Sequence, residues 1–430
     1  MMKRYNLPKK ENWSEICARP TFEQVELYDC VKAILNNVKS SGDDALFEYT
    51  EKFDGAKLDT LLVSEAEMQD AVERVSEELK RAIQSAKRNI EKFHISQKDE
   101  ATIIETTEGV ACWRKSVAIE KVGLYIPGGS APLFSTILML GIPAVQAGCK
   151  EIILCSPPNK NGELNPAILY AAQLVGVTKL FKIGGAQAIG AMAYGTESIP
   201  QVYKIFGPGN QFVTKAKELV QQEGIAIDMP AGPSEVLVIA DDSCEPEFVA
   251  ADLLSQAEHG SDSQVILLSN DAEILASTNE ELRVQLNQLP RKEIAQKALE
   301  NSKSVLCSSI NECLKLSNYY APEHLIIASK NADEYAAQVI NAGSVFLGNY
   351  SCESAGDYAS GTNHTLPTNG YARSYSGVSL DSFVRKITFQ KLSEEGIRNI
   401  GPAIELMAEA EELFAHKNAV TLRLNSLNDV

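Results

Sequence analysis

The stretch that decides the fold is Val202-Tyr-Lys-Ile-Phe-Gly-Pro-Gly-Asn210, in which a short apolar run ends in a glycine turn. Valine, isoleucine and phenylalanine favour a buried strand, and the turn leads into a helical pattern that continues through Leu219. Helix-length segments separate this run from similar ones, a pattern typical of β-α-β units with parallel sheets. The other runs are residues 122–126, 152–155, 180–183, 236–240, 265–268 and 325–328.

These runs are numerous enough for two parallel sheets, one over about residues 118–232 and one over about 234–375. The chain before them, from Thr21 to about Gln97, has apolar residues at helical spacing, so we predict an all-helical lead-in. After Arg385 we predict an amphipathic helix over 402–414 and a short terminal strand at 420–424. This tail has an apolar face but little core, so we expect it to pack on another surface, such as that of a second subunit.

Composition narrows the classes of function. The 430 residues are 44% apolar and 23% charged, as in a globular protein, and the net charge of −17 argues against broad binding of nucleic acid or anionic membranes. The N-terminus lacks the apolar core of a signal peptide, and no run approaches the roughly 18 apolar residues of a spanning helix, so we expect a cytoplasmic protein with a small-molecule partner. Nine cysteines without a C-x-x-C pair disfavour both a disulfide framework and a cysteine-ligated zinc.

Three glycine-rich turns, at residues 125–130, 184–190 and 207–210, each follow a predicted strand and precede a predicted helix. Such turns let a ligand phosphate approach backbone N–H groups at a helix N-terminus, although turns of this kind are glycine-rich in any α/β protein. The third turn has the first two glycines of the dinucleotide fingerprint but Phe212 in place of the third, and Asp228 stands at the distance of a ribose-binding acid. A P-loop is excluded, because Gly190 is followed by Ala-Met.

A predicted helix that Pro246 opens and Gly260 ends carries Gln256 and His259 on one face. The pair could supply two zinc ligands, completed by an acid and a second histidine from elsewhere, or it could be an ordinary hydrogen-bonded pair. Asp357, in a polar glycine-bearing segment, could provide the oxygen ligand, and His416 could be the fourth.

Glu323 and His324 follow Pro322 directly before a predicted strand. Ligands bind at strand ends in open α/β sheets, and a carboxylate beside an imidazole can exchange protons near neutral pH. A solvent-exposed turn is the alternative.

With these segments in view, the chain closely resembles the histidinol dehydrogenase family. The resemblance runs in order from about residue 120 to 420. The matching stretches are Gly123-Leu-Tyr-Ile-Pro-Gly-Gly129, Gly184-Gly-Ala-Gln-Ala-Ile189, Phe206-Gly-Pro-Gly-Asn210, Asp228-Met-Pro-Ala-Gly-Pro-Ser-Glu235, Leu254-Ser-Gln-Ala-Glu-His-Gly260, Ala321-Pro-Glu-His-Leu325, Ser360-Gly-Thr-Asn-His364 and Ala415-His-Lys-Asn-Ala419.

The resemblance implies oxidation of L-histidinol to L-histidine through bound L-histidinal, in histidine biosynthesis, with two NAD molecules reduced in turn. It implies one zinc ion per subunit, which orients the substrate and is held by Gln256, His259, Asp357 and His416. His324 would remove the alcohol proton, and Glu323 would activate the water that attacks the aldehyde. Further substrate contacts would come from Ser234, His364 and Glu411, and NAD contacts from Tyr125, Gln187 and Asn210.

The resemblance also implies a homodimer of two incomplete Rossmann-like domains, in which Glu411 and His416 act on the neighbouring subunit. The expected division is an N-terminal extension (1–20), a discontinuous substrate and zinc domain (21–120 and 234–378), an NAD domain (121–233) and a tail (379–430). Two alternatives remain. One is a zinc hydrolase with Glu323 as general base, and the other is a non-catalytic binding module with structural zinc.

Overall fold

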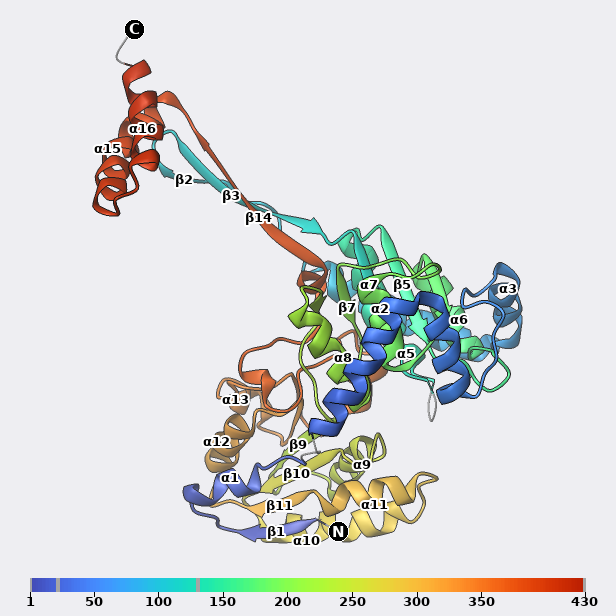
Figure 1. Cartoon of the computed structure of the whole chain (residues 1–430). Coiled ribbons are helices and arrows are strands. Elements are labelled where there is room, and N and C mark those ends of the chain that lie inside the picture. The colour runs from blue at the N-terminus through green and yellow to red at the C-terminus, as the bar shows by residue number, and fades with distance from the viewer. Residues whose placement is uncertain (1, 21–23, 129–131, 428–430) are drawn as a thin grey trace.

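A computed structural model of the chain describes residues 2–20, 24–128 and 132–427. It has two bodies, each built on a parallel sheet, and a long arm that leads away from them to a pair of helices (Figure 1). The predicted α/β fold with two parallel sheets and N-terminal helices is confirmed.

The first sheet has five parallel strands in the order β6-β5-β4-β7-β8. Its strands are apolar and buried, so helices can cover both faces with two separate cores. The strands are β4 (Lys121–Tyr125), β5 (Glu151–Ser156), β6 (Lys179–Lys182), β7 (Lys204–Phe206) and β8 (Ala226–Ile227). The helices that connect them are α5 (Phe134–Ala147), α6 (Pro166–Val175), α7 (Gly185–Tyr194) and α8 (Gln211–Gln222).

The second sheet has six parallel strands in the order β1-β11-β10-β9-β12-β13, and the N-terminal strand forms one edge. Its strands are β1 (Lys3–Asn6), β9 (Glu235–Ala240), β10 (Gln264–Ser269), β11 (Lys303–Leu306), β12 (His324–Ala328) and β13 (Ser344–Leu347). Its helices are α1 (Trp13–Ile16), α9 (Pro246–Ala257), α10 (Ala272–Leu286), α11 (Lys292–Glu300), α12 (Ile310–Tyr320) and α13 (Ala332–Ala336). The N-terminal residues are thus an integral part of the second body.

Three helices precede the first sheet, as predicted: α2 (Gln24–Asp54), α3 (Glu65–Arg74) and α4 (Glu77–Ile95). The expected domain division, which groups them with the second sheet, stays a prediction; in the structure all three helices pack on helices of the first sheet. The apolar stripe of α2 lies against α7, and that of α4 lies against α5. The position of these helices in the sequence did not indicate which sheet they cover, because both sheets have apolar faces.

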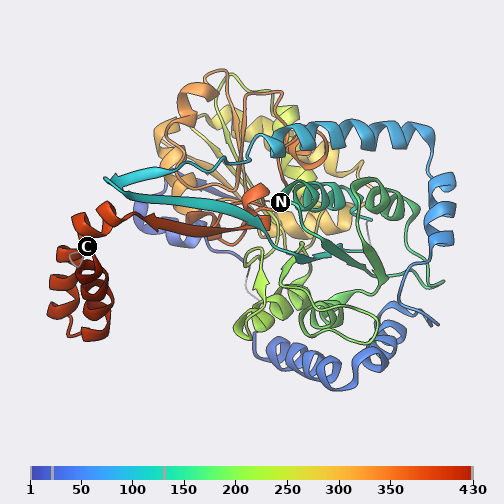
Figure 2. The same ribbon diagram turned by 90° about the horizontal axis from the view of Figure 1, so that it is seen from above.

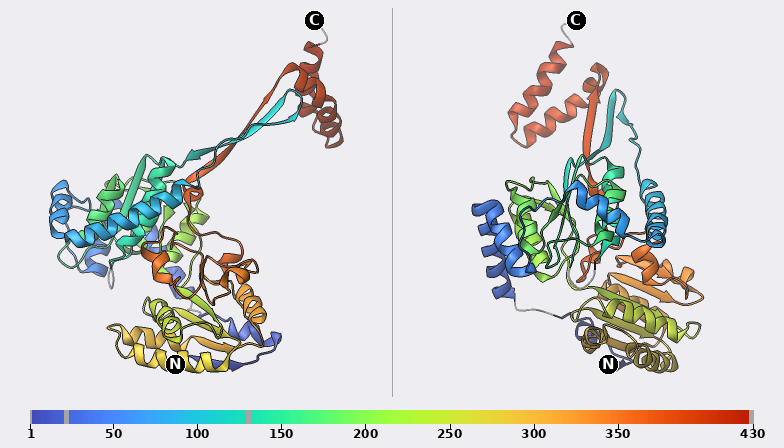
Figure 3. Two further views of the ribbon diagram at one scale, coloured as in Figure 1. Left: turned by 180° about the vertical axis from the view of Figure 1, so that it is seen from behind. Right: turned by 90° about the vertical axis from the view of Figure 1, so that its right-hand side faces the viewer.

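The arm is a three-stranded antiparallel sheet in the order β14-β3-β2. It comprises β2 (Ile104–Thr107), β3 (Val110–Ala118) and β14 (Val384–Leu392), and it carries α15 (Glu394–Ala410) and α16 (Phe414–Ser426) at its far end (Figures 1 and 2). From every side the two helices stand apart from both bodies (Figure 3).

Two predictions for this tail are wrong. The terminal strand at 420–424 is part of α16, because Val420 is buried and Leu424, one helical turn later, packs on Gly401 of α15. The helix predicted over 402–414 begins earlier, at Glu394, where the Ser393 side chain accepts from the Gly396 N–H and caps it. It ends at Ala410, with Pro402 in its interior.

All nine cysteines are free, as expected. Within the described ranges, no helix is both long enough and apolar enough to cross a membrane.

Candidate active site and metal centre

The candidate acid–base residues, Glu323 and His324, lie at the amino end of β12, next to the amino end of β9 in the second sheet. Glu235 opens β9, His324 opens β12, and His324 is in register with Val236. The general expectation for open α/β sheets is a ligand at the carboxyl ends of the strands. In the first sheet, the glycine turns lie at the carboxyl ends of the strands, in agreement with that expectation. In the second sheet, Glu323 and His324 lie at the opposite edge, where the strands begin.

The main chain of Glu235 fixes both side chains of the Glu323–His324 pair. The Glu235 N–H donates to Glu323 Oε2 at 2.8 Å, and the Glu235 carbonyl lies 3.2 Å from His324 Nδ1. Because a carbonyl oxygen only accepts, Nδ1 carries a proton and Nε2 is directed to the site, where it lies 3.6 Å from Asp357 Oδ1. Glu323 and His324 are buried, so the alternative of a solvent-exposed turn is wrong.

Three carboxylates surround the single His324 imidazole. Glu323 and Glu353 lie 3.7 and 4.0 Å from Nδ1, and Asp357 lies beside Nε2. Burial alone would lower the pKa of His324, but the nearby carboxylates raise it well above its ordinary value. Burial raises the pKa of Glu353 well above its usual range. The buried carboxyl groups here outnumber the basic groups, and such an environment favours the binding of a cation.

The candidate metal ligands come from two helices. Gln256 is in the last turn of α9, and Asp357 and Glu353 are one turn apart on α14 (Glu353–Tyr358). His259 lies two residues beyond the end of α9 rather than on it, but its N–H still bonds the Gln256 carbonyl at 3.3 Å. Ligand atoms of His259, Glu353 and Asp357 lie within 4.8 Å of one another.

This set fits zinc by the chemistry of its donors, which are imidazole nitrogen and carboxylate oxygen. At this site, three buried side-chain atoms have no hydrogen-bond partner among the described residues: Glu353 Oε2, Asp357 Oδ1 and His324 Nε2. The Gln256 amide is buried, and in the orientation that satisfies both of its ends the nitrogen donates to Glu353 Oε1 while the oxygen accepts from the Glu235 N–H at 2.9 Å.

The structure does not bring Glu411 or His416 to this site within one chain. Glu411 follows α15 and His416 lies on α16, both are exposed, and both helices are at the far end of the arm. The other two expected substrate contacts are nearby. Ser234 directly precedes Glu235, and His364 holds the carbonyl of Asp357 at 2.9 Å through Nδ1 and Thr136 Oγ1 of α5 at 3.0 Å through Nε2. Burial lowers the pKa of His364.

The expected cofactor contacts lie at the carboxyl edge of the first sheet. Tyr125 ends β4, and its hydroxyl accepts from the Gly185 N–H at 3.1 Å. Gln187 is buried in α7, and the Asn210 side chain caps α8 by accepting from two backbone N–H groups. Gly129 and Ser130, part of the first glycine turn, lie outside the described residues.

Asp228 does not serve as a ribose-binding acid. Its carboxylate is buried, pairs with Lys217 Nζ at 2.5 Å and accepts from the Gly207 N–H at 2.8 Å. Lys217 Nζ also donates to the Gly207 carbonyl at 2.9 Å, so the pair holds both polar groups of this residue. Gly207 has φ of 127°, and a Cβ there would lie 2.1 Å from the Tyr125 carbonyl oxygen. The turn is therefore fixed by packing and charge together.

Sequence reasoning gave no role to Glu353 or to Arg19. Glu353 and Asp357 are four residues apart, which places both carboxylates on one face of a helix, and this spacing could have identified Glu353. Nothing local marks Arg19, because its partners lie more than two hundred residues away in the chain.

A family model described as histidinol dehydrogenase matches residues 17–424. The chain is 62% identical to a histidinol dehydrogenase of Bacteroides thetaiotaomicron, over 99% of this chain and all of that protein. It is 53% identical to one of Escherichia coli, over 99% and 98% of the two chains. A solved histidinol dehydrogenase structure from Elizabethkingia anophelis matches with a TM-score of 0.97 and 61% identity, over 99% of each chain.

Proposed function

Since the chain belongs to the histidinol dehydrogenase family, we propose that it oxidises L-histidinol to L-histidine through a bound aldehyde, with two NAD molecules as hydride acceptors. The observation that carries the proposal is the buried Glu323–His324 pair, whose side chains are both held by main-chain atoms of one residue, Glu235. One site for both oxidations retains the reactive aldehyde between the two steps.

In the first oxidation, His324 Nε2 takes the proton of the substrate hydroxyl while the carbon gives a hydride to NAD. The His324 Nδ1 bond to the Glu235 carbonyl supports this role, because it leaves Nε2 as the nitrogen that faces the site. The products of this step are the aldehyde, one NADH and one proton.

In the second oxidation, Glu323 takes a proton from water as the water oxygen bonds to the aldehyde carbon. The hydrate, which keeps one negatively charged oxygen after the proton has gone to Glu323, then gives a second hydride to the second NAD and becomes a carboxylic acid. The buried position of Glu323 favours its action as a base, because burial removes competing water from the carboxylate.

We propose that Gln256, His259 and Asp357 hold a zinc ion together with His416 from a second copy of the chain. Glu353 supplies further negative charge beside them. When bound, zinc would orient the substrate by its imidazole and amine nitrogens. Tyr125, Gln187 and Asn210 would contact NAD near the glycine turns, where backbone N–H groups favour a phosphate.

The arm supports a homodimer. Leu406, Met407, Phe414 and Leu422 are exposed on α15 and α16, and Glu411 and His416 lie in the same helix pair. A second copy that receives this helix pair would cover the apolar side chains and bring Glu411 and His416 to the substrate.

The first test counts NADH per L-histidinol consumed by the zinc-loaded protein. We expect two NADH, and one NADH with Glu323→Gln because the aldehyde step is blocked. Absence of NADH from metal-replete protein would contradict the dehydrogenase and favour the hydrolase.

The dimer has its own test, which mixes inactive His416→Ala with inactive His259→Ala under conditions that exchange subunits. Hybrid dimers contain one site with both defects and one intact site, so we expect up to about half of full activity per hybrid dimer. No recovery despite demonstrated exchange would contradict action of His416 across subunits.

A further inference from the structure

We propose that Arg19 and Glu235 form a positioning pair that aligns both bases of the reaction through the main chain of Glu235. The inference deepens the proposed function and rests on it for the roles of Glu323 and His324. Neither Arg19 nor the Glu235 side chain needs to touch the substrate, so we assign them positioning roles.

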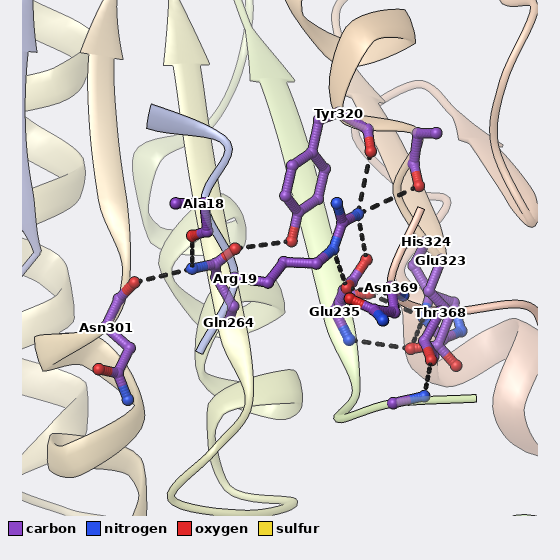
Figure 4. Close-up of polar contacts among 12 residues, drawn as sticks. Ala18, Arg19, Glu235, Gln264, Asn301, Tyr320, Glu323, His324, Thr368 and Asn369 are labelled. Carbon is purple, nitrogen blue, oxygen red and sulfur yellow. Dashed lines mark hydrogen bonds and ion pairs between the residues drawn. The ribbon is translucent and has the colours of Figure 1, made fainter. Parts of the chain in front are cut away.

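Arg19 holds the Glu235 side chain by two parallel hydrogen bonds. Arg19 Nε lies 2.5 Å from Glu235 Oε1, and an Arg19 terminal nitrogen lies 2.9 Å from Oε2. Glu235 Oε1 also accepts from the Asn369 N–H at 2.9 Å (Figure 4). Such a bidentate contact fixes the plane as well as the position of a carboxylate, which lysine could not do.

Besides Glu235, the carbonyl and the ring of Tyr320 also hold the Arg19 guanidinium group. It donates to the Tyr320 carbonyl at 2.9 Å and lies 3.9 Å from the centre of the Tyr320 ring. The Tyr320 hydroxyl donates to Gln264 Oε1 at 2.9 Å, and Gln264 Nε2 donates to the Ala18 carbonyl, next to Arg19 in the chain, at 3.0 Å (Figure 4). Arg19 therefore has one well-defined orientation, which it can impose on its partner.

The next link is the main chain of Glu235, whose N–H and C=O belong to the two peptide groups on either side of its Cα. Its N–H holds Glu323 and its C=O holds His324 Nδ1, so a rotation of this residue would disturb both bases together. Glu235 is the first residue of β9, and β9 pairs with β12 from His324 onward. Just before the strand, the Ser234 carbonyl accepts from the Gln264 N–H at 3.1 Å. The Glu235 side chain adds a second anchor at this strand start, where pairing with β12 has only begun.

A positioning role of the Arg19–Glu235 pair predicts results that a purely structural role would not. When the anchor is lost, both oxidations should slow by similar factors, since both bases depend on the main chain of one residue, Glu235. The proton on His324 should also lose its preference for Nδ1. A pair that merely stabilises the fold would lower the unfolding temperature without changing kcat or the His324 tautomer.

The experiment compares Arg19→Gln, Arg19→Lys and Glu235→Gln in the full-length, zinc-loaded protein. The rates with L-histidinol and with L-histidinal as starting substrates report on the two oxidations separately. We expect each kcat to fall at least about tenfold for Arg19→Gln, with KM for NAD changed less than about twofold. Arg19→Lys should recover little, because it restores the charge without the second hydrogen bond.

The second measurement is ¹⁵N NMR of histidine-labelled protein, which is practical because the chain has only five histidines. His324→Gln assigns the signal. At a pH high enough for His324 to be neutral, we expect the wild-type residue to carry its one proton on Nδ1 and Arg19→Gln to show a mixture of tautomers.

Arg373→Gln is the matched control. Arg373 lies close by and donates to the Tyr319 carbonyl, but it has no hydrogen bond or ion pair with Glu235 in the described structure. We expect wild-type kcat and an unchanged His324 signal. If Arg19→Gln folds and matches this control in both measurements, the inference is overturned. If Arg19→Gln does not fold, Glu235→Gln, which keeps the length of the side chain and one acceptor, decides by the same readouts.

The inference and the proposed function can fail separately. A wild-type protein that makes no NADH contradicts the function, whereas the His324 tautomer still tests the positioning pair. A wild-type protein that makes two NADH while Arg19→Gln keeps both rates contradicts the positioning pair alone.

Discussion

Replacement of Lys217 by methionine should destabilise the first body and weaken NAD binding together. Lys217 and Asp228 have side chains only 5% and 1% exposed, and their charged atoms are 2.5 Å apart. Loss of one partner from such a buried pair costs about 3–5 kcal/mol, because the other charge stays buried without compensation. Asp228 keeps the N–H groups of Gly207 and Met229 as donors, so we expect the lower part of that range, about 3 kcal/mol.

The assay is urea unfolding followed by circular dichroism, with the wild type, Lys217→Met, Asp228→Asn and the double variant. The double variant removes both charges, so its loss of stability should be smaller than the sum of the single losses by about 2 kcal/mol. The Kd for NAD should rise in Lys217→Met, since the ammonium group of Lys217 in the wild type holds the Gly207 carbonyl in the proposed phosphate-binding turn. Lys39→Met is the control, because Lys39 pairs with Glu223 at 2.9 Å on the surface.

The control should lose no more than about 1 kcal/mol. A loss in Lys217→Met no larger than that of Lys39→Met, or simple additivity in the double variant, would refute the idea that the buried pair holds the turn. Unchanged NAD affinity in a measurably destabilised Lys217→Met would refute the link between this turn and the cofactor.

Three further predictions concern other parts of the molecule. Burial raises the pKa of Asp54 to about 6 from an ordinary 3.8, so the folded protein keeps the neutral carboxyl group below pH 4 and loses its proton, and with it stability, as the pH rises through 6. In thermal unfolding, Asp54→Asn should be as stable as the wild type near pH 4. At pH 8 it should be more stable by about 1 kcal/mol, a figure reduced for the partial exposure of Asp54. Asp357→Asn should retain less than half of the zinc of the wild type by metal analysis, and chelation should abolish the activity of the wild type until zinc is restored; full zinc in the variant would contradict the ligand assignment. Met407→Glu, at a side chain 66% exposed on α15, should yield inactive monomers in sedimentation experiments, and an active dimer would show that this face is not the interface.

The two parallel sheets were predictable because their central strands are continuous apolar runs with turns at both ends. The strands that sequence patterns missed are short or polar. β1 is Lys-Arg-Tyr-Asn and takes its place only by pairing with β11, and β14 is mostly exposed. Residues 420–424 of α16 resemble a strand in sequence because Val420, Leu422 and Leu424 alternate, whereas the packing of Leu424 on Gly401 is a tertiary contact.

The candidate site was predictable where the relevant residues are neighbours in sequence or resemble known motifs. Gln256, His259, Glu323 and Asp357 are all found at one place. The contribution of Glu235 could not be foreseen, because it acts through its main-chain atoms and any residue type has those. Arg19 was missed for a related reason, since only the folded chain brings it to Glu235.

The pairing of β1 with β11 also sets an order on protein synthesis. Lys3 leaves the ribosome well before its partner, Lys303, which follows 300 residues later. At about 5–20 residues per second, the nascent chain carries its first strand unpaired for roughly 15–60 s. The five-stranded sheet, complete at Ile227, can form during this delay, whereas the edge of the second sheet cannot close until β11 has been made, through Leu306. A truncated product that stops before residue 303 would therefore keep a folded first body beside an N-terminal strand with no sheet to join.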